Sequence, residues 1–410
     1  MSSSAEVRPA GLYAVYASGF FSLSLVPMTS LAVPLWAVSL GAPPAMIGIA
    51  IAARSVLPFF LSIHGGVMMD RLGTRQVTLF FTLTGALFSL LYPLLPWIGA
   101  VIVLQLFIGL AQGMGWIGAQ TKIARLARGS PVYAGRFSFF TTLGTFIGPM
   151  LVGKAWDTLG AWGAFTAIAL WGGGLFLAAF ALPAPSAIGR SRRRLHVRDF
   201  IPRLSDYFQA FALLGSASIA LVVIATFMRI AAFSVQGSFY AVYLHGIGLS
   251  GAAIGVLVGF ASLLGGPAAL LVGPALKRVR ADWLLLASNA VAIVFICVTP
   301  LLHDFILLLI AAGLFGLGYG IALPLLLSIL SEATGVKEQG MSVGLRTTAN
   351  RLASIVIPLA MGFIGEWAGI DNAFLIVGTL LLILGAVAVV LIRYPALSHH
   401  ARAHGAGNRD

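Results

Sequence analysis

Long apolar stretches separated by short polar segments run through the whole 410-residue chain. A helix needs about 20 apolar residues to cross ~30 Å of hydrocarbon. Twelve stretches have about this length or more: 11–40, 44–66, 77–97, 99–121, 136–158, 161–183, 212–244, 249–274, 283–301, 304–330, 341–368 and 372–393. The pattern predicts an all-α membrane protein with twelve transmembrane helices.

The composition supports a membrane protein, with 59% hydrophobic and only 9% charged residues. Soluble domains carry roughly a quarter charged residues, so an ordinary cytosolic enzyme is excluded. The first apolar stretch is longer than a signal-peptide core, and we expect no cleavage. The sequence contains no nucleotide-binding loop, no nucleophile with a paired base and one cysteine, Cys297. We therefore expect no enzymatic activity, no cofactor and no metal site.

The 25 Lys and Arg residues outnumber the 12 Asp and Glu residues, and they are unevenly placed along the chain. With twelve spans and the N-terminus inside, the segments on the opposite side keep only Lys154. Because cytoplasmic loops collect Lys and Arg, this asymmetry predicts that both termini are cytoplasmic. We expect a multi-pass protein of the plasma (inner) membrane. The membrane explains the basic charge, so we expect no nucleic-acid partner.

The longest polar stretch falls between the sixth and seventh spans and divides the chain into two halves. Its basic residues are typical of a linker that lies against anionic lipid headgroups. The sequence thus predicts an N-terminal six-helix bundle (1–184), a basic cytoplasmic linker (185–207), a C-terminal six-helix bundle (208–395) and a disordered cytoplasmic tail (396–410).

Three short matches recur in the same order in both halves. They pair 35–40 and 45–48 with 239–244 and 252–255, 113–116 with 316–319, and Pro149 and Gly153 with Pro358 and Gly362. The repeats indicate two related bundles with pseudo-two-fold symmetry. Parallel halves of this kind place the substrate between them, near the midplane.

The turn between the second and third spans carries the motif Gly66, Asp70, Arg71, Gly73 and Arg75. This spacing resembles the cytoplasmic signature of the major facilitator superfamily: Gly, three residues, Asp-Arg, any residue, Gly, any residue and a basic residue. The likeness extends over the whole chain, since twelve spans, two halves and a central basic linker all fit. It implies two bundles that rock about a central site, with Asp70 closing the cytoplasmic side against the other half. The corresponding turn, 273–280, lacks the acid and the second glycine, which predicts asymmetric gating.

The fifth span contains Gly148, Pro149 and Gly153. This element resembles the Gly-Pro motif of export-type members of the family, although its usual paired glycine is shifted. Glycines four residues apart let helices approach closely, and a proline can bend the span. We count Gly148 and Pro149 among the gating candidates; the alternative is ordinary packing of small residues.

Arginines in the middle of apolar spans are the strongest chemical signal. Arg54, Arg229 and Arg351 lie deep in their spans, whereas Arg346 is closer to the cytoplasm. An arginine at the bilayer centre costs about 2.5–3.5 kcal/mol, so such a side chain faces water, a partner or a ligand. No Asp or Glu lies at comparable depth. Two alternatives stay open: Arg346 reaches the interface by snorkelling and serves as a gate, and Arg54 and Arg229 pair with backbone carbonyls.

Four residues of the seventh span recur at i, i+4, i+7 and i+11 and so share one helical face: Arg229, Phe233, Gln236 and Tyr240. A planar guanidinium group binds a carboxylate or phosphate through two hydrogen bonds. We expect this face to form the wall of a binding cavity. Further candidates for substrate contact are Arg54, Gln112, Trp116, Asn350 and Arg351.

These features predict a secondary transporter, working as a monomer in the bilayer, that moves a small organic anion by alternating access. Exchange of anions or co-transport with a proton would both fit. The alternative is proton-coupled efflux of drugs or other lipophilic compounds. Two departures count against it: Gly109 stands where exporters of the family carry an arginine, and no carboxylate lies inside the membrane. A non-transporting receptor with the same fold is a third possibility.

Overall fold

The computed structural model describes residues 9–127, 131–182, 216–333 and 339–393, and all regular structure in these ranges is helical. The first half contains α1 (Pro9–Ser39), α2 (Pro44–Leu72), α3 (Thr74–Ser89), α4 (Leu91–Leu94), α5 (Ile98–Ala127) and α6 (Pro131–Phe180). The second half contains α8 (Ala217–Val235), the π-helix η3 (Gln236–Tyr240), α9 (Ala241–Gly246), α10 (Gly251–Ala268), η4 (Ala269–Leu271), α11 (Val272–Leu276), α12 (Ala281–Cys297), η5 (Thr299–Leu301), α13 (Phe305–Ala333), α14 (Gln339–Ala368) and α15 (Ile370–Arg393). The expected linker (185–207) and tail (396–410) lie outside the described residues.

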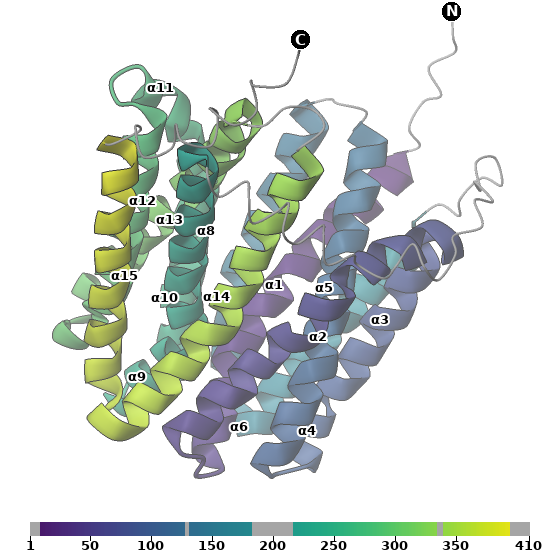
Figure 1. The fold of residues 1–410 in the computed structure, drawn as a ribbon. Coiled ribbons are helices and arrows are strands. Elements are labelled where there is room, and N and C mark those ends of the chain that lie inside the picture. The colour runs from purple at the N-terminus through teal and green to yellow at the C-terminus, as the bar shows by residue number, and fades with distance from the viewer. Residues whose placement is uncertain (1–8, 128–130, 183–215, 334–338, 394–410) are drawn as a thin grey trace, which may run out of the picture.

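Ten helices of the described residues are long and apolar enough to cross a membrane. One of them, α6, contains two of the expected spans, because Gly160 interrupts it with a non-helical conformation (φ 59°, ψ −145°). The 17-residue apolar helix α12 falls just short of the length of these ten and lies where the ninth span is expected. The two halves lie side by side, the first coloured purple to blue and the second teal to yellow (Figure 1). The all-α, two-bundle fold expected from the sequence is confirmed.

The molecule has two ends, which we name after their glycines. The Gly160 end carries the connections at 40–43, 95–97, 247–250 and Gly369, and the Gly73 end carries the α2–α3 turn and the segment 277–280. Gly73 adopts φ 95°, a conformation that glycine accepts at little cost, and so joins α2 directly to α3. Arg75 follows this turn, donates to the carbonyl of Phe180 at 2.6 Å and lies over the Phe180 ring.

The contact of Arg75 with Phe180 therefore ties α3 to α6 within the first half. The rest of the motif around this turn lies partly outside the described residues: nothing is described of Gly66 beyond its helix, or of the side chains of Asp70 and Arg71. Their gating role stays a prediction.

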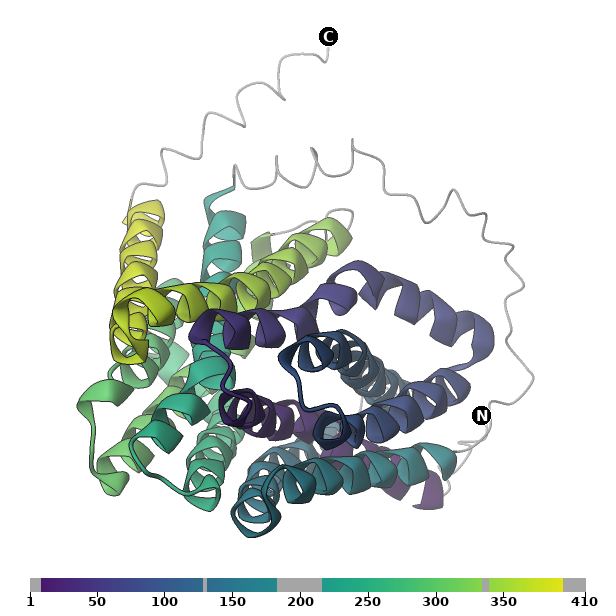
Figure 2. The same cartoon turned by 90° about the horizontal axis from the view of Figure 1, so that it is seen from below.

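Two helix crossings join the halves near the Gly160 end, α6 with α10 and α2 with α14 (Figure 2). A methyl group added at Gly255 would collide with the carbonyl oxygen of Pro149. In the other crossing, a methyl group at Gly48 would collide with the carbonyl oxygen of Pro358. Glycine is required at both positions because a helix backbone lies where a side chain would be.

Each repeated proline–glycine pair also contributes its glycine, Gly153 or Gly362, to the same crossing. A methyl group at Gly153 would meet the carbonyl oxygen of Gly251, and one at Gly362 would meet that of Pro44. Two of the three repeats recognised in the sequence therefore correspond to equivalent contacts between the halves. Gly148, by contrast, packs against Met28 of α1 within the first half.

A carboxylate four residues after each of these glycines reaches across to the other half. Asp157 accepts hydrogen bonds from the N–H groups of Gly251 (2.6 Å) and Ala252 (2.8 Å), the first residues of α10. Glu366 accepts one from the N–H group of Ala45 at 3.0 Å, at the start of α2. The first N–H groups of a helix lack partners within it and favour a negative charge. Each half thus caps a helix of the other.

We predict that replacing both acids, Asp157→Ala with Glu366→Ala, opens the Gly160 end. Each lost cap costs about 1 kcal/mol, so the ratio of open to closed molecules should rise roughly thirtyfold. Spin labels at Thr158→Cys and Asn372→Cys, in a Cys297→Ala background, report the distance between the halves; both label positions are exposed.

The matched control is Asp304→Ala, because Asp304 caps its own helix, α13, through the N–H groups of Ile306 and Leu307. A longer distance population in the double variant alone is expected. Identical distance distributions in the double variant and the control would contradict the prediction.

Candidate functional site

A cavity of about 500 Å³ lies between the two halves. Its walls come from α1, α5 and α6 of the first half and from α8, η3, α10 and α13 of the second. On α6 the residues that line the cavity, 137–145, come before the segment that crosses α10. On α10 the residues that line the cavity come after the segment that crosses α6. The cavity is therefore on the Gly73 side of the crossings, which separate it from the Gly160 end.

Arg229 is the one charged residue among the described residues that line this cavity. Its side chain is 8% exposed, and its Nε donates to the carbonyl of Tyr319 at 3.1 Å. The guanidinium carbon lies 3.6 Å from the centre of the Tyr319 ring, where a cation is attracted by the π-electrons. No acidic residue lines the cavity within the described part of the chain.

The Tyr319 ring is the centre of an aromatic cluster. Phe233 stacks against it with centroids 5.3 Å apart, and Phe315 does so at 5.9 Å. All three rings line the cavity. On the opposite side, Trp116 of α5 stacks against Phe137 of α6 at 6.1 Å. The described lining of the cavity thus combines a single cation with five aromatic rings.

Gln236 is another polar side chain that the second half presents to the cavity. It is 7% exposed, and its Nε2 has no hydrogen-bond partner among the described residues. Gln236 begins the π-helix η3, whose wider turn changes the register of the residues that follow it. Tyr240, at the end of η3, is 1% exposed, packs in the core and does not line the cavity. The shared face expected from the sequence therefore holds for Arg229, Phe233 and Gln236 but not for Tyr240.

Arg54 lies outside the cavity lining, in contact with α1. Its Nη1 donates to Ser30 Oγ at 3.0 Å and to Thr29 Oγ1 and the carbonyl of Val26 at 3.4 Å each. This geometry corresponds to the structural pairing considered as an alternative from the sequence. Substrate contact by Arg54 stays a prediction.

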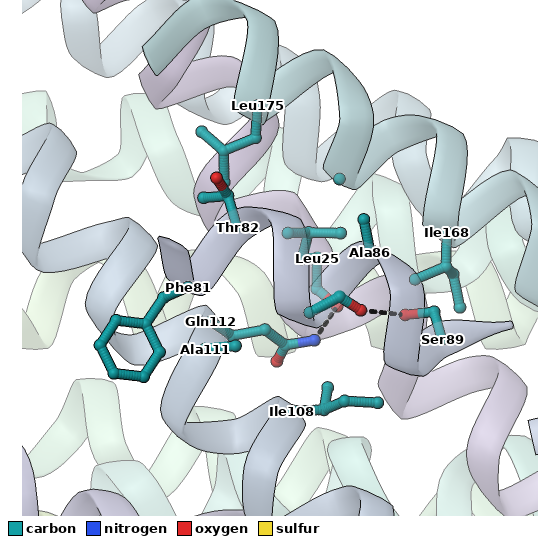
Figure 3. A pocket seen from close by; sticks show the side chains of 12 residues that line it. Leu25, Phe81, Thr82, Ala86, Ser89, Ile108, Ala111, Gln112, Ile168 and Leu175 are labelled. Carbon is teal, nitrogen blue, oxygen red and sulfur yellow. Dashed lines mark hydrogen bonds between the residues drawn. The ribbon is translucent and has the colours of Figure 1, made fainter. Parts of the chain in front are cut away.

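Gln112 also braces α1, and it lines a second, much smaller cavity inside the first half. Its Nε2 donates to the carbonyl of Leu25 at 3.3 Å (Figure 3). It also donates to Thr29 Oγ1 at 3.3 Å. The small cavity measures about 20 Å³, enough for about one water molecule. The Oε1 of Gln112 has no partner among the described residues. Gln112 is thus well placed to hold a buried water, and substrate contact by it stays a prediction.

The candidates on α14 do not line the cavity. Arg346, Asn350 and Arg351 are all partly exposed, and none belongs to its lining. The structure therefore brings four of the predicted site residues together at the cavity: Arg229, Phe233, Gln236 and Trp116.

Two features of the cavity escaped the sequence reasoning. Tyr319 was noticed only as the repeat partner of Trp116, yet both line the cavity from opposite halves. The other feature is a row of hydroxyl side chains on α6: Ser138, Thr141, Thr142 and Thr145. Their spacing at i, i+3, i+4 and i+7 marks one face of a helix, and four hydroxyls on one face of a membrane span were a readable signal.

We predict that Arg54→Gln lowers the thermal stability of the protein without ligand. The substitution removes hydrogen bonds between α2 and α1, worth about 1–2 kcal/mol in total within a membrane. The melting temperature of the purified protein in detergent measures the effect. Arg280→Gln is the control, because Arg280 is 74% exposed and pairs with its neighbour Asp282. An Arg54→Gln variant as stable as this control would contradict the structural role.

Comparison with known proteins identifies the family. Residues 14–226 and 222–408 each match the family model of the Major Facilitator Superfamily. The sequence has no significant match among curated proteins.

Solved structures of transporters share the fold. A variant of the nucleoside transporter NupG superposes with a TM-score of 0.78 at 15% identity, covering 93% of this chain and 99% of that one. A bacterial homologue of the human lysosomal transporter Spinster superposes with a TM-score of 0.70 at 13% identity, covering 94% of this chain and 98% of that one. The human organic anion transporter MFSD10 superposes with a TM-score of 0.58 at 18% identity, covering 92% of this chain and 99% of that one. The chain, matched over both halves and folded as two helical bundles around a cavity, belongs to the major facilitator superfamily and is a membrane transporter.

Proposed function

We propose that this transporter moves a small organic anion by alternating access, as a secondary active carrier. The observation that carries the proposal is Arg229, a cation that lines the cavity between the halves and has no acidic neighbour among the described lining residues. A buried charge is costly unless it is paired. Nε of Arg229 donates to the carbonyl of Tyr319, and the Nη groups are the donors that we expect to bind a carboxylate.

We propose that the protein lies in the plasma (inner) membrane with its Gly73 end on the cytoplasmic side. The support is the excess of Lys and Arg in the segments at this end, including Lys277, Arg278 and Arg280. In this orientation the cavity lies on the cytoplasmic side of the crossings, and Asp157 and Glu366 close the external side. Both termini and the linker (185–207) are then cytoplasmic.

For the opposite state, with the cavity facing outward, we propose that the turn between α2 and α3 closes the cytoplasmic side. Asp70 and Arg71 would bridge to the second half, and Gly66, Gly73 and Arg75 would shape the turn. Arg346 lies in the first third of α14, near the Gly73 end of the molecule, and is a further gating candidate. Pro149 would act at the other end, in the crossing of α6 with α10.

Efflux of lipophilic compounds is the second candidate function. The aromatic lining favours it, since Trp116, Phe137, Phe233 and Phe315 offer apolar surface for such a compound. A lipophilic cation, however, would meet the positive charge of Arg229 without a compensating carboxylate. The two functions therefore differ in the charge of the substrate.

We predict that Arg229→Gln lowers the transport of organic anions about tenfold to a hundredfold, the value of charge-assisted hydrogen bonds to one carboxylate. Counterflow in liposomes measures it with aromatic and aliphatic carboxylates, the neutral amides of the same carbon skeletons, and lipophilic amines. Arg229→Lys keeps the charge but loses the planar fork, so we expect partial activity.

Arg280→Gln is again the control for insertion and folding, and it should transport like the wild type. Transport of carboxylates at the wild-type rate by Arg229→Gln would refute the proposal. Transport of lipophilic amines that is unaffected by Arg229→Gln would favour efflux instead.

A further inference from the structure

We propose that the cavity selects an elongated aromatic monoanion: a carboxylate that pairs with Arg229, a ring that packs against Phe233 and Tyr319, and a hydrogen-bond acceptor at the far end that pairs with Gln236. This inference deepens the proposed function and rests on it for the role of Arg229. It adds the shape of the substrate and a residue that determines specificity.

The predicted charge of the substrate follows from the residues that line the cavity. Arg229 is the single cation among the lining residues, and the rest of the described lining is neutral. A dianion would bring a second charge into a largely apolar cavity without a partner, which is strongly unfavourable. One carboxylate per substrate molecule is therefore the charge that this cavity matches.

The aromatic ring of the proposed substrate follows from the order of the lining residues along α8 and η3. Phe233 lies one turn beyond Arg229 and one turn before Gln236, so it occupies the middle of the lined face. It is stacked on Tyr319 with an interplanar angle of 23°. An aromatic substrate can extend this stack or pack edge-on against it, which gives more than the burial of an equal apolar area.

The acceptor follows from Gln236. The Gln236 side chain lines the cavity, and its buried Nε2, which carries two N–H bonds, has no partner among the described residues. A buried donor without a partner costs free energy, and a substrate carbonyl or ether oxygen would remove that cost. Gln236 is seven residues beyond Arg229, about 10 Å along a helix. Because the Arg229 and Gln236 side chains are both several bonds long, a carboxylate and an acceptor roughly 6–10 Å apart in the substrate can reach the two donors.

Three hydroxyls that line the cavity are not free to donate to a substrate acceptor, two of them on α6 and one on α10. Thr141 donates to the carbonyl of Phe137 at 2.8 Å, and Thr145 donates to that of Thr142 at 2.8 Å. Ser262 likewise donates to the carbonyl of Val258 at 3.3 Å. These hydroxyl protons are used within their own helices. The Nη groups of Arg229 and the amide of Gln236 are thus the donors best placed for a ligand.

The test uses 4-acetamidobenzoate as the probe, because it carries a carboxylate, a ring and an amide carbonyl in line. Three analogues each lack one feature: 4-isopropylbenzoate lacks the acceptor, 4-acetamidobenzamide lacks the charge, and trans-4-acetamidocyclohexanecarboxylate lacks the aromatic ring. Dissociation constants from thermal shift and uptake by counterflow are compared for the full chain. We expect 4-acetamidobenzoate to bind more tightly than each analogue, by about fivefold to tenfold over 4-isopropylbenzoate.

Gln236→Leu should remove the preference for 4-acetamidobenzoate over 4-isopropylbenzoate, and Gln236→Met serves as a second variant of similar length. The matched control is Gln105→Leu, because Gln105 is a buried amide of α5 that does not line the cavity. This control should keep the preference. A Gln236 variant that weakens both benzoates equally has lost structure rather than recognition and overturns the inference.

The remaining outcomes separate the inference from the proposed function. Equal binding of the ring-free analogue overturns the aromatic part. Counterflow of other carboxylates that depends on Arg229, without binding of 4-acetamidobenzoate, overturns the inference and leaves the organic anion carrier intact. Binding of the neutral amide as tight as that of the acid, unchanged in Arg229→Gln, overturns both.

Discussion

The crossings of α6 with α10 and of α2 with α14 are the constraint on which the rest of the molecule depends. At each crossing a glycine lies against the carbonyl of a proline in the other half, so the backbones approach as closely as helices can. The capping carboxylates, Asp157 and Glu366, fix the same end. Because the halves are held together there, the space between them lies on the Gly73 side, and that space is the cavity.

Within that cavity the energetics of Arg229 decide what the site can accept. An arginine at the bilayer centre costs about 2.5–3.5 kcal/mol. The Tyr319 ring offsets about 1–2 kcal/mol of this, and the hydrogen bond to its carbonyl offsets about 1 kcal/mol. Under the proposed function, water or the substrate anion would meet what remains. A carrier of this kind would reorient slowly with the arginine unpaired, and exchange of one anion for another would then be favoured.

The sequence was informative wherever a pattern belongs to a single helix or to the repeat. Span positions, the two halves and the glycine–proline pairs follow from periodicity and order, and Arg229, Phe233 and Gln236 follow from one helical face. Tyr240 was predicted on the same face but does not line the cavity, because the π-helix that starts at Gln236 changes the register of the residues after it. No residue type in the sequence predicts such a π-helix. Arg54 differed for another reason: its partners, Thr29 and Ser30, belong to a different helix, and contacts between helices are invisible to a pattern read along one of them.

The crossings are symmetric, but the chemistry of the cavity is not. The second half supplies the cation, the amide and most of the aromatic cluster, whereas the first half supplies hydroxyls and Trp116. Under the proposed function, an anion held by Arg229 would travel with the second half, and the contacts that change would be those made by the first. A ligand shifts an equilibrium only through its differential affinity for the two states. The proposal therefore assigns the coupling between binding and reorientation to Trp116 and the hydroxyl row of α6, although neither carries the charge that would attract the substrate.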